Sequence, residues 1–174
     1  MDAQTAARAT DVEPVWLRLP KHRVESRARV WWAAQAFVRF LFIAGAMALL
    51  YLWVEQLRPW LGPPLVVVLV GGVLYIAVMP FWRYAVHRWE FTEEAVYSRT
   101  GWYVREWRVA PLSRIQTVDT VQGPIEQLLG LARLAVTTAS AHGAIYISGL
   151  DQETAAEAAR RLTEITQLTP GDQT

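Results

Sequence analysis

Few residues of this chain have side chains suited to catalysis. The histidines His22, His87 and His142 lie far apart in the sequence, without the spacing of metal ligands. There is no cysteine, so disulfides, thiolate metal sites and cysteine nucleophiles are excluded. Asp119 and Glu126 are two carboxylates without a visible acid–base partner, and no Gly-x-Ser-x-Gly elbow is present. We therefore predict a protein that is not an enzyme, and we expect no metal and no cofactor.

Arginine side chains offer a different chemistry, which is the binding of anions and polar partners. The candidate contacts with a lipid headgroup or a protein partner are Arg99, Arg105, Arg108, Arg114 and Gln116. Residues 83–174 carry nine basic and eleven acidic residues, a balance that weakens attraction to anionic lipid and argues against a nucleic-acid partner. The alternative for Arg114 is a surface ion pair with Asp119 or a neighbour. The sequence identifies no small-molecule ligand.

Apolar residues, 53% of the chain, are concentrated in its first half. Residues 61–82 contain no charge, and as a helix these 22 residues reach about 33 Å, enough for a hydrocarbon core of about 30 Å. The preceding uncharged run is shorter, so we extend that span to residues 34–57. It then includes Arg39, whose guanidinium can reach the headgroups. The pattern predicts a hairpin of two transmembrane helices within residues 31–82, although buried helices of a soluble protein are the alternative.

Tryptophans and basic residues predict the edges and the orientation of this hairpin. Five tryptophans lie at the predicted edges, where indoles favour the interface or, alternatively, ordinary core packing: Trp31, Trp32, Trp53, Trp60 and Trp82. Six of the basic residues lie before the first span or near its start: Arg18, Lys21, Arg23, Arg27, Arg29 and Arg39. Only Arg58 lies between the spans, so the positive-inside rule predicts a two-pass plasma-membrane protein with both termini cytoplasmic. Alternatively, the basic segment is a solvated face or an arm on anionic lipid. No signal peptide is visible.

The region after the hairpin has short strand-like runs separated by turn signals. Strands are predicted at 88–92, 95–100, 103–109, 114–121, 131–138 and 144–148. Asp151 is a plausible N-cap for a final helix with an apolar stripe at Ala155, Ala158, Leu162 and Ile165 and an ion pair between Glu157 and Arg161. The predicted organisation is a basic segment (1–30), the hairpin (31–82), a β-rich domain with one helix (83–168) and a flexible tail (169–174).

Two stretches of this domain carry a family resemblance. Residues 111–119 read PLSRIQTVD and residues 122–132 read QGPIEQLLGLA. With the order of elements, they make the chain, from about Arg23 to Ile165, resemble the bacterial pleckstrin-homology-like, membrane-flanked family often called YdbS-like. The matching positions are Pro111, Arg114, Ile115, Gln116, Val118, Gly123, Pro124, Leu129, Gly130 and Leu131. The resemblance implies a membrane-bound protein with a pleckstrin-homology-like barrel of about seven strands, closed by a C-terminal helix. It also implies action through protein or lipid contacts and oligomerisation.

The second stretch can also be interpreted from its residues alone. Gly123 and Pro124 end a strand, because proline cannot donate to a ladder. Ile125, Leu128 and Leu129 then suit one helical turn tucked onto the barrel, and we expect Gly130 to end that turn with positive φ. On this interpretation the motif is structural.

Three functional hypotheses follow. The first is a non-catalytic scaffold for interaction or assembly at the inner membrane face, with a protein partner or a second copy of the chain. The second is a sensor of anionic lipid headgroups. The third is an accessory subunit of a membrane transporter or enzyme, since two spans are too few to form a transport path alone.

Overall fold

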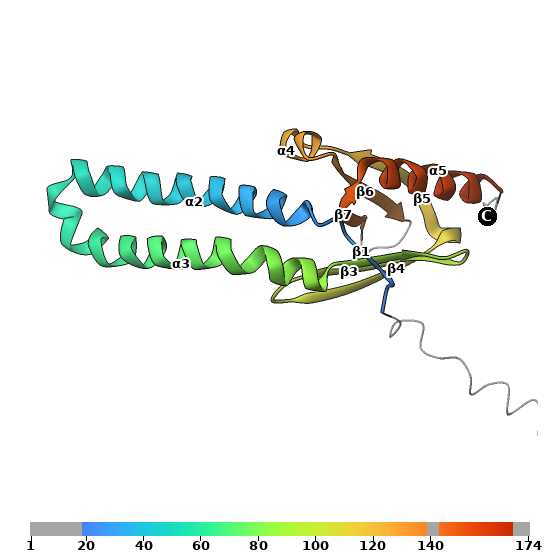
Figure 1. The fold of residues 1–174 in the computed structure, drawn as a ribbon, viewed down its shortest axis with the longest axis horizontal. Helices are drawn as coiled ribbons and strands as arrows, with labels where there is room; N and C mark the ends of the chain where they lie inside the picture. Colours follow the sequence, from blue (N-terminus) through green and yellow to red (C-terminus); the bar gives the residue numbers. More distant parts are fainter. Residues whose placement is uncertain (1–18, 139–142, 169–174) are drawn as a thin grey trace, which may run out of the picture.

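The computed structural model describes residues 19–138 and 143–168, with side chains up to residue 165. A hairpin of two long helices extends from one side of a small two-sheet domain (Figure 1). Predictions that concern Arg18, His142 and residues 169–174 lie outside the described residues.

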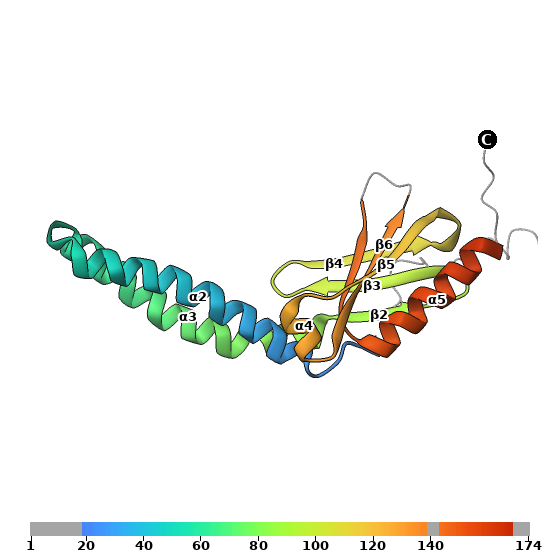
Figure 2. The same cartoon turned by 90° about the horizontal axis from the view of Figure 1, so that it is seen from above.

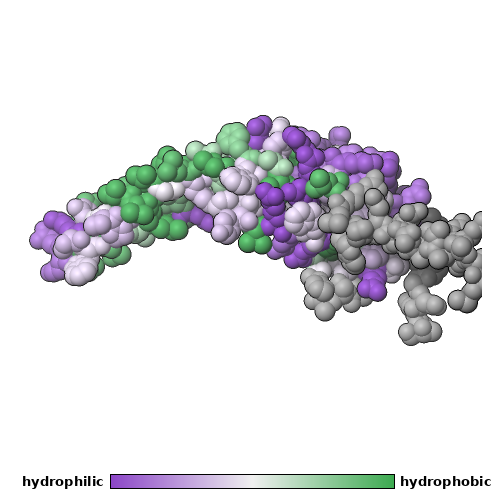
Figure 3. Space-filling model, turned by 90° about the horizontal axis from the view of Figure 1, so that it is seen from below, coloured by the Kyte–Doolittle hydropathy of each residue, from purple (hydrophilic) through white to green (hydrophobic). Residues whose placement is uncertain are grey.

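The hairpin consists of α2 (Ala28–Trp53), the short η2 (Glu55–Leu57) and α3 (Arg58–Val86). Both long helices are long and apolar enough to cross a membrane. Figure 3 shows hydrophobic surface over the middle of the helices and hydrophilic surface at their connection. The helices begin and end a few residues away from the predicted spans 34–57 and 61–82, and α2 ends early because Val54 is extended. Which part of each helix lies in lipid remains a prediction.

The two helices approach closely in the middle of the hairpin. A Cβ built on Gly72 would lie 2.2 Å from the ring of Phe40, so only glycine allows this contact. Small residues serve the same purpose at other helix contacts in membranes. Gly71 has nothing within 4 Å and faces away. One of the two adjacent glycines is therefore used for helix packing.

The domain has seven strands within the described residues, in two antiparallel sheets. The first sheet has the order β1-β2-β3-β4, from β1 (His22–Arg23), β2 (Arg88–Phe91), β3 (Ala95–Gly101) and β4 (Arg105–Pro111). The second has the order β5-β6-β7, from β5 (Ile115–Val121), β6 (Leu131–Thr138) and β7 (Ile145–Asp151). This confirms the pleckstrin-homology-like class, although no ladder joins the sheets into a closed barrel across the described strands. β1, from the segment before the hairpin, was not predicted.

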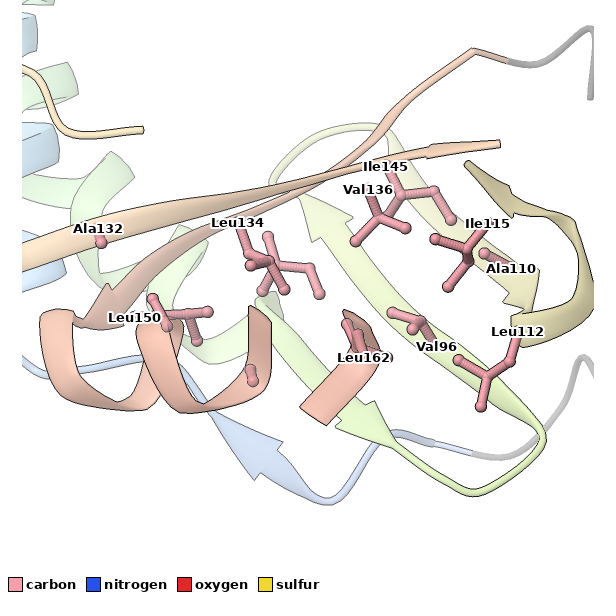
Figure 4. Close-up of a cluster of buried hydrophobic side chains, with 13 residues drawn as sticks. Val96, Ala110, Leu112, Ile115, Ala132, Leu134, Val136, Ile145, Leu150 and Leu162 are labelled. Atoms are coloured by element: carbon pink, nitrogen blue, oxygen red, sulfur yellow. The ribbon is translucent and has the colours of Figure 1, made fainter. Parts of the chain in front are cut away.

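The core lies between the sheets and under the final helix α5 (Gln152–Leu168). Figure 4 shows aliphatic side chains from both sheets and α5 meeting there: Val96, Ala110, Leu112, Ile115, Leu134, Val136, Ile145, Leu150 and Leu162 among them. The predicted stripe of α5 is confirmed, since Ala155, Ala158 and Leu162 are buried. The predicted pair of Glu157 and Arg161 is also present, at 2.6 Å. In the view of Figure 2, α5 lies across the strands, and it covers the open side of the two sheets.

The family motif has structural contacts around the one-turn helix α4 (Pro124–Leu128). The buried Glu126 carboxylate accepts a hydrogen bond from the Gly123 amide (2.6 Å) and lies 3.1 Å from the Arg133 guanidinium. Gly130 has φ of 62°, as predicted. The expected packing of Leu128 is wrong, because its side chain is 87% exposed. In so short a helix only one face meets the domain, and Ile125 and Leu129 occupy it.

A second buried cluster joins the hairpin to the domain. It contains Val24, Ala28, Trp31, Trp32, Ala36, Met79 and Leu131. Trp31 and Trp32 are buried there and do not face lipid, whereas Trp53 and Trp60 are 84% and 79% exposed at the far end. Arg27 reinforces the junction by donating to the Leu129 carbonyl (3.0 Å) and the Asp151 carboxylate (2.5 Å). The start of α2 is therefore packed on the second sheet as well as on α3.

Candidate membrane-proximal binding site

Three arginines gather on the first sheet beside the end of α3. Antiparallel register places Arg88 opposite Arg99, and Arg99 opposite Trp107 on β4. Arg105 lies at the start of β4, opposite Gly101. Residues directly opposite in a sheet share a face, so these side chains form one cationic group. Arg88 was missed in the sequence, although the turn between Thr92 and Ala95 sets a register that pairs it with Arg99.

This cationic group has no neutralising carboxylate among the residues that the structure describes. Within residues 19–138 and 143–165, none of the three arginines forms an ion pair. Burial lowers the pKa of Arg99, and the nearby positive charges of Arg105 and Arg88 lower it further. Its Nε is buried without a hydrogen-bond partner, while its guanidinium carbon lies 5.0 Å from the centroid of the Trp107 ring. Like charges this close destabilise a sheet, and a bound anion would relieve the repulsion.

A groove of about 610 Å³ separates Arg99 and Arg105 from the last turns of α3. Its helical wall consists of Ala77, Val78, Phe81, Trp82, Ala85 and Val86. The helical wall is therefore apolar and the facing wall is cationic. Such a groove suits an amphipathic ligand with an anionic group and a hydrocarbon portion.

The other predicted contact residues lie elsewhere. Arg108 donates to the Ala144 carbonyl (3.1 Å) and to Glu106 (3.2 Å), so it bridges β4 to the chain before β7. Arg114 is exposed on η3 (Leu112–Arg114), beyond the opposite end of β4 from Arg105, and Gln116 is exposed on β5. Within the described chain no ion pair links Arg114 to Asp119. The roles of Arg108, Arg114 and Gln116 remain predictions.

His87 lies buried where α3 meets β2. Its Nδ1 lies 2.9 Å from the Arg83 carbonyl, and Arg83 Nε lies 3.5 Å from its Nε2. These partners fit a neutral imidazole with the proton on Nδ1, because one ring nitrogen must donate and the other must accept. Burial, and secondly the charge of Arg83, lower the pKa of His87 to about 4. The imidazole of His87 is therefore neutral when the junction between α3 and β2 is folded.

No cluster suited to metal binding is found in the part of the chain that the structure describes, where three or more His, Asp or Glu side chains would have to meet. The ring of His22 packs against Trp89 (5.1 Å between ring centroids), and that of His87 packs against Trp32 (4.8 Å). Both described histidines thus have aromatic neighbours.

The apolar hairpin, the two-sheet domain capped by a helix and the arginine-lined groove together define a membrane-anchored pleckstrin-homology-like protein. A family model described as Bacterial PH domain matches residues 36–166, and the chain belongs to that family. It is similar to the UPF0699 transmembrane protein YdbS of Bacillus subtilis (strain 168), with 28% identity over 104 residues. The match covers 60% of this chain and 64% of that relative, which is less than two thirds of the relative's length. No solved structure matches the chain at a comparable level.

Proposed function

We propose that this protein is a non-catalytic membrane module whose domain binds anionic lipid headgroups at the inner face of the plasma membrane. The observation that supports this most directly is the group of Arg88, Arg99 and Arg105 beside the end of α3, which forms no ion pair within the described residues. The proposal reverses the order of the hypotheses drawn from the sequence, in which a scaffold came first.

The height of the arginines along α3 supports lipid as the ligand. If Trp60 marks the outer edge of the hydrocarbon core, a core of about 30 Å ends some 20 helical residues later, near Pro80. The groove is lined by α3 residues on both sides of Pro80, from Ala77 to Val86. Arg99 and Arg105 would therefore lie at the level of the inner-leaflet phosphates, which guanidinium groups bind well.

The slight acidity of the whole domain does not oppose this proposal. Attraction to a membrane surface depends on charge close to that surface, because it falls off within about 10 Å at ordinary salt. Glu93 and Glu94 lie in the β2–β3 turn, at the opposite end of the sheet from Arg105. The excess of acidic residues over the whole domain therefore says little about the end that faces the helices.

Native mass spectrometry of the detergent-solubilised full chain would test the proposal. The probe is phosphatidylglycerol, compared with phosphatidylcholine. Each arginine near an anionic surface contributes about 1 kcal/mol, so the double variant Arg99→Gln/Arg105→Gln should bind phosphatidylglycerol about 30-fold more weakly. The charge-matched control Arg160→Gln/Arg161→Gln changes two exposed arginines of α5 and should bind as the parent does.

Equal retention of the two lipids by the parent chain would refute the proposal. So would equal losses of phosphatidylglycerol binding in the two double variants, because the charge would then act without regard to place. Phosphatidylcholine binding should stay unchanged in every variant.

A scaffold for a protein partner or a second copy is the second candidate, favoured by the outer edge of β4. β4 pairs only with β3 among the described strands, and Trp107 on it is 48% exposed. An open edge can accept a strand from another chain. A photo-crosslinker at Glu106 would test this in cells, and recovery of monomer alone would count against it. No particular contact favours an accessory subunit of a transporter or enzyme.

A further inference from the structure

We propose that the tip of the β3–β4 hairpin, Trp102-Tyr103-Val104, inserts into the inner leaflet of the bilayer that the helices cross. The hairpin would then be a third membrane contact of the chain, formed by the domain itself. The proposal goes beyond headgroup binding because its chemistry is apolar and its residues differ.

The tip lies beside α3. The ring of Trp102 meets the ring of Tyr75 edge-on, with centroids 5.6 Å apart. Tyr75 lies 11 residues before the end of α3, or about 16 Å back along the helix toward the membrane. Figure 1 shows the β3–β4 hairpin running back beneath the end of α3. The tip therefore reaches past the last turns of the helix.

The depth of Tyr75 along α3 places the tip within the inner leaflet. From Trp60, at the outer end of the hairpin, to Tyr75 the helix advances about 22 Å. A hydrocarbon core of about 30 Å leaves about 8 Å between Tyr75 and the inner boundary. Elements that lie in the interface bury their apolar face about 5–10 Å deep. Trp102, held against Tyr75, falls within that range.

The side chains of the tip have the chemistry of the membrane interface. Trp102, Tyr103 and Val104 are 40%, 85% and 67% exposed, and no charge interrupts them. Tryptophan and tyrosine favour the membrane interface, where the ring is buried and its polar atom stays wet. Arg99 and Arg105 flank this tip at its base. The apolar tip would then lie among the acyl chains, and the arginines at its base would lie at the level of the phosphates.

The shape of the turn requires glycine at its first position. Gly101 has φ of 104°, and a Cβ on it would lie 1.8 Å from the Val104 carbonyl oxygen. Only glycine fits this turn without moving the backbone.

Because the chain has no cysteine, single-cysteine variants of the full chain can carry a spin label at a chosen site. The test variant is Tyr103→Cys, with Val104→Cys as a second in case the first does not fold. The control is Glu94→Cys, in the turn at the opposite end of β3. Each is reconstituted in phosphatidylglycerol–phosphatidylcholine vesicles. Collision of the label with oxygen, which partitions into lipid, is compared with collision with a water-soluble nickel chelate.

The expected result is a several-fold higher ratio of oxygen to nickel collisions at residue 103 than at residue 94. The ratio at residue 103 should be the same when Arg99→Gln and Arg105→Gln are added, because these changes keep the tip and remove only the charges. Failure of headgroup binding is therefore distinguishable from failure of insertion. Equal nickel access at residues 103 and 94 would overturn the proposal. Spin–spin broadening at residue 103 that grows with the protein-to-lipid ratio would also overturn it, since a second copy would then cover the tip.

Discussion

Acidification should loosen the junction between hairpin and domain through His87. The folded chain holds this imidazole neutral, with Nδ1 at the Arg83 carbonyl and Nε2 facing the Arg83 guanidinium. Protonation would place a new N–H on Nε2, against the guanidinium N–H from which Nε2 now accepts. The tilted ring of Trp32, from α2, packs against the imidazole and supplies no compensating negative charge.

The size of the effect follows from the two pKa values. In the folded chain the pKa of His87 is about 4, against 6.5 in an unfolded chain. The unfolded state therefore binds more protons between these values, so stability is complete above pH 6.5 and falls as the pH drops toward 4. The full loss is about 3 kcal/mol, of which about 2.5 kcal/mol is reached by about pH 4.5.

Thermal melting in detergent at about pH 7.5 and about pH 4.5, followed by tryptophan fluorescence, measures this loss. The matched variant is His87→Gln, whose amide can donate to the Arg83 carbonyl and accept from the guanidinium without titrating. Carboxylates titrate in both proteins, so the difference between them isolates His87. For a domain of this size, about 2.5 kcal/mol corresponds to about 10 °C or more in Tm. If parent and variant lose the same Tm on acidification, the neutral imidazole is not what stabilises the junction.

Two further predictions concern stability. Glu126→Ala removes the buried carboxylate that caps α4 and should lower the free energy of unfolding by about 2 kcal/mol, measured by thermal melting. The control Glu157→Ala removes an exposed carboxylate and should lower it by less than about 0.5 kcal/mol, and equal losses in the two variants would contradict the capping role. Gly149→Ala should lower Tm more than Gly143→Ala does. Both glycines have positive φ, but only at 149 would an added Cβ meet α2, 2.8 Å from Ala28. Equal losses of Tm would show that the contact with α2 is not close.

The hairpin and most strands could be predicted from the sequence because their signals are local. A charge-free run as long as residues 61–82 is rare outside membrane spans, and the turn residues near Gly101 and Gly123 separate the strands. β1 could not be predicted, because two polar residues carry no alternation. His22 and Arg23 become a strand only because the chain passes the edge of β2 before α2 begins.

The candidate site was predictable only in part. Arg99 and Arg105 were named from the sequence as residue types, but their proximity depends on the pairing of β3 with β4 and on the approach of that hairpin to α3. Such a contact between distant segments leaves no local pattern. In the sequence Arg108 looked equivalent to Arg99 and Arg105. In the structure it donates hydrogen bonds to the Ala144 carbonyl and to Glu106 and does not line the groove.

The proposed lipid site depends most on the domain lying at the inner membrane face, with the connection between the helices outside. An impermeant maleimide applied to intact cells tests this with Gln56→Cys, in η2, and Glu94→Cys, in the β2–β3 turn. We predict labelling of residue 56 in intact cells and of residue 94 only after the cells are permeabilised. Labelling of residue 94 in intact cells, with residue 56 protected, would contradict the orientation and with it the proposed lipid site.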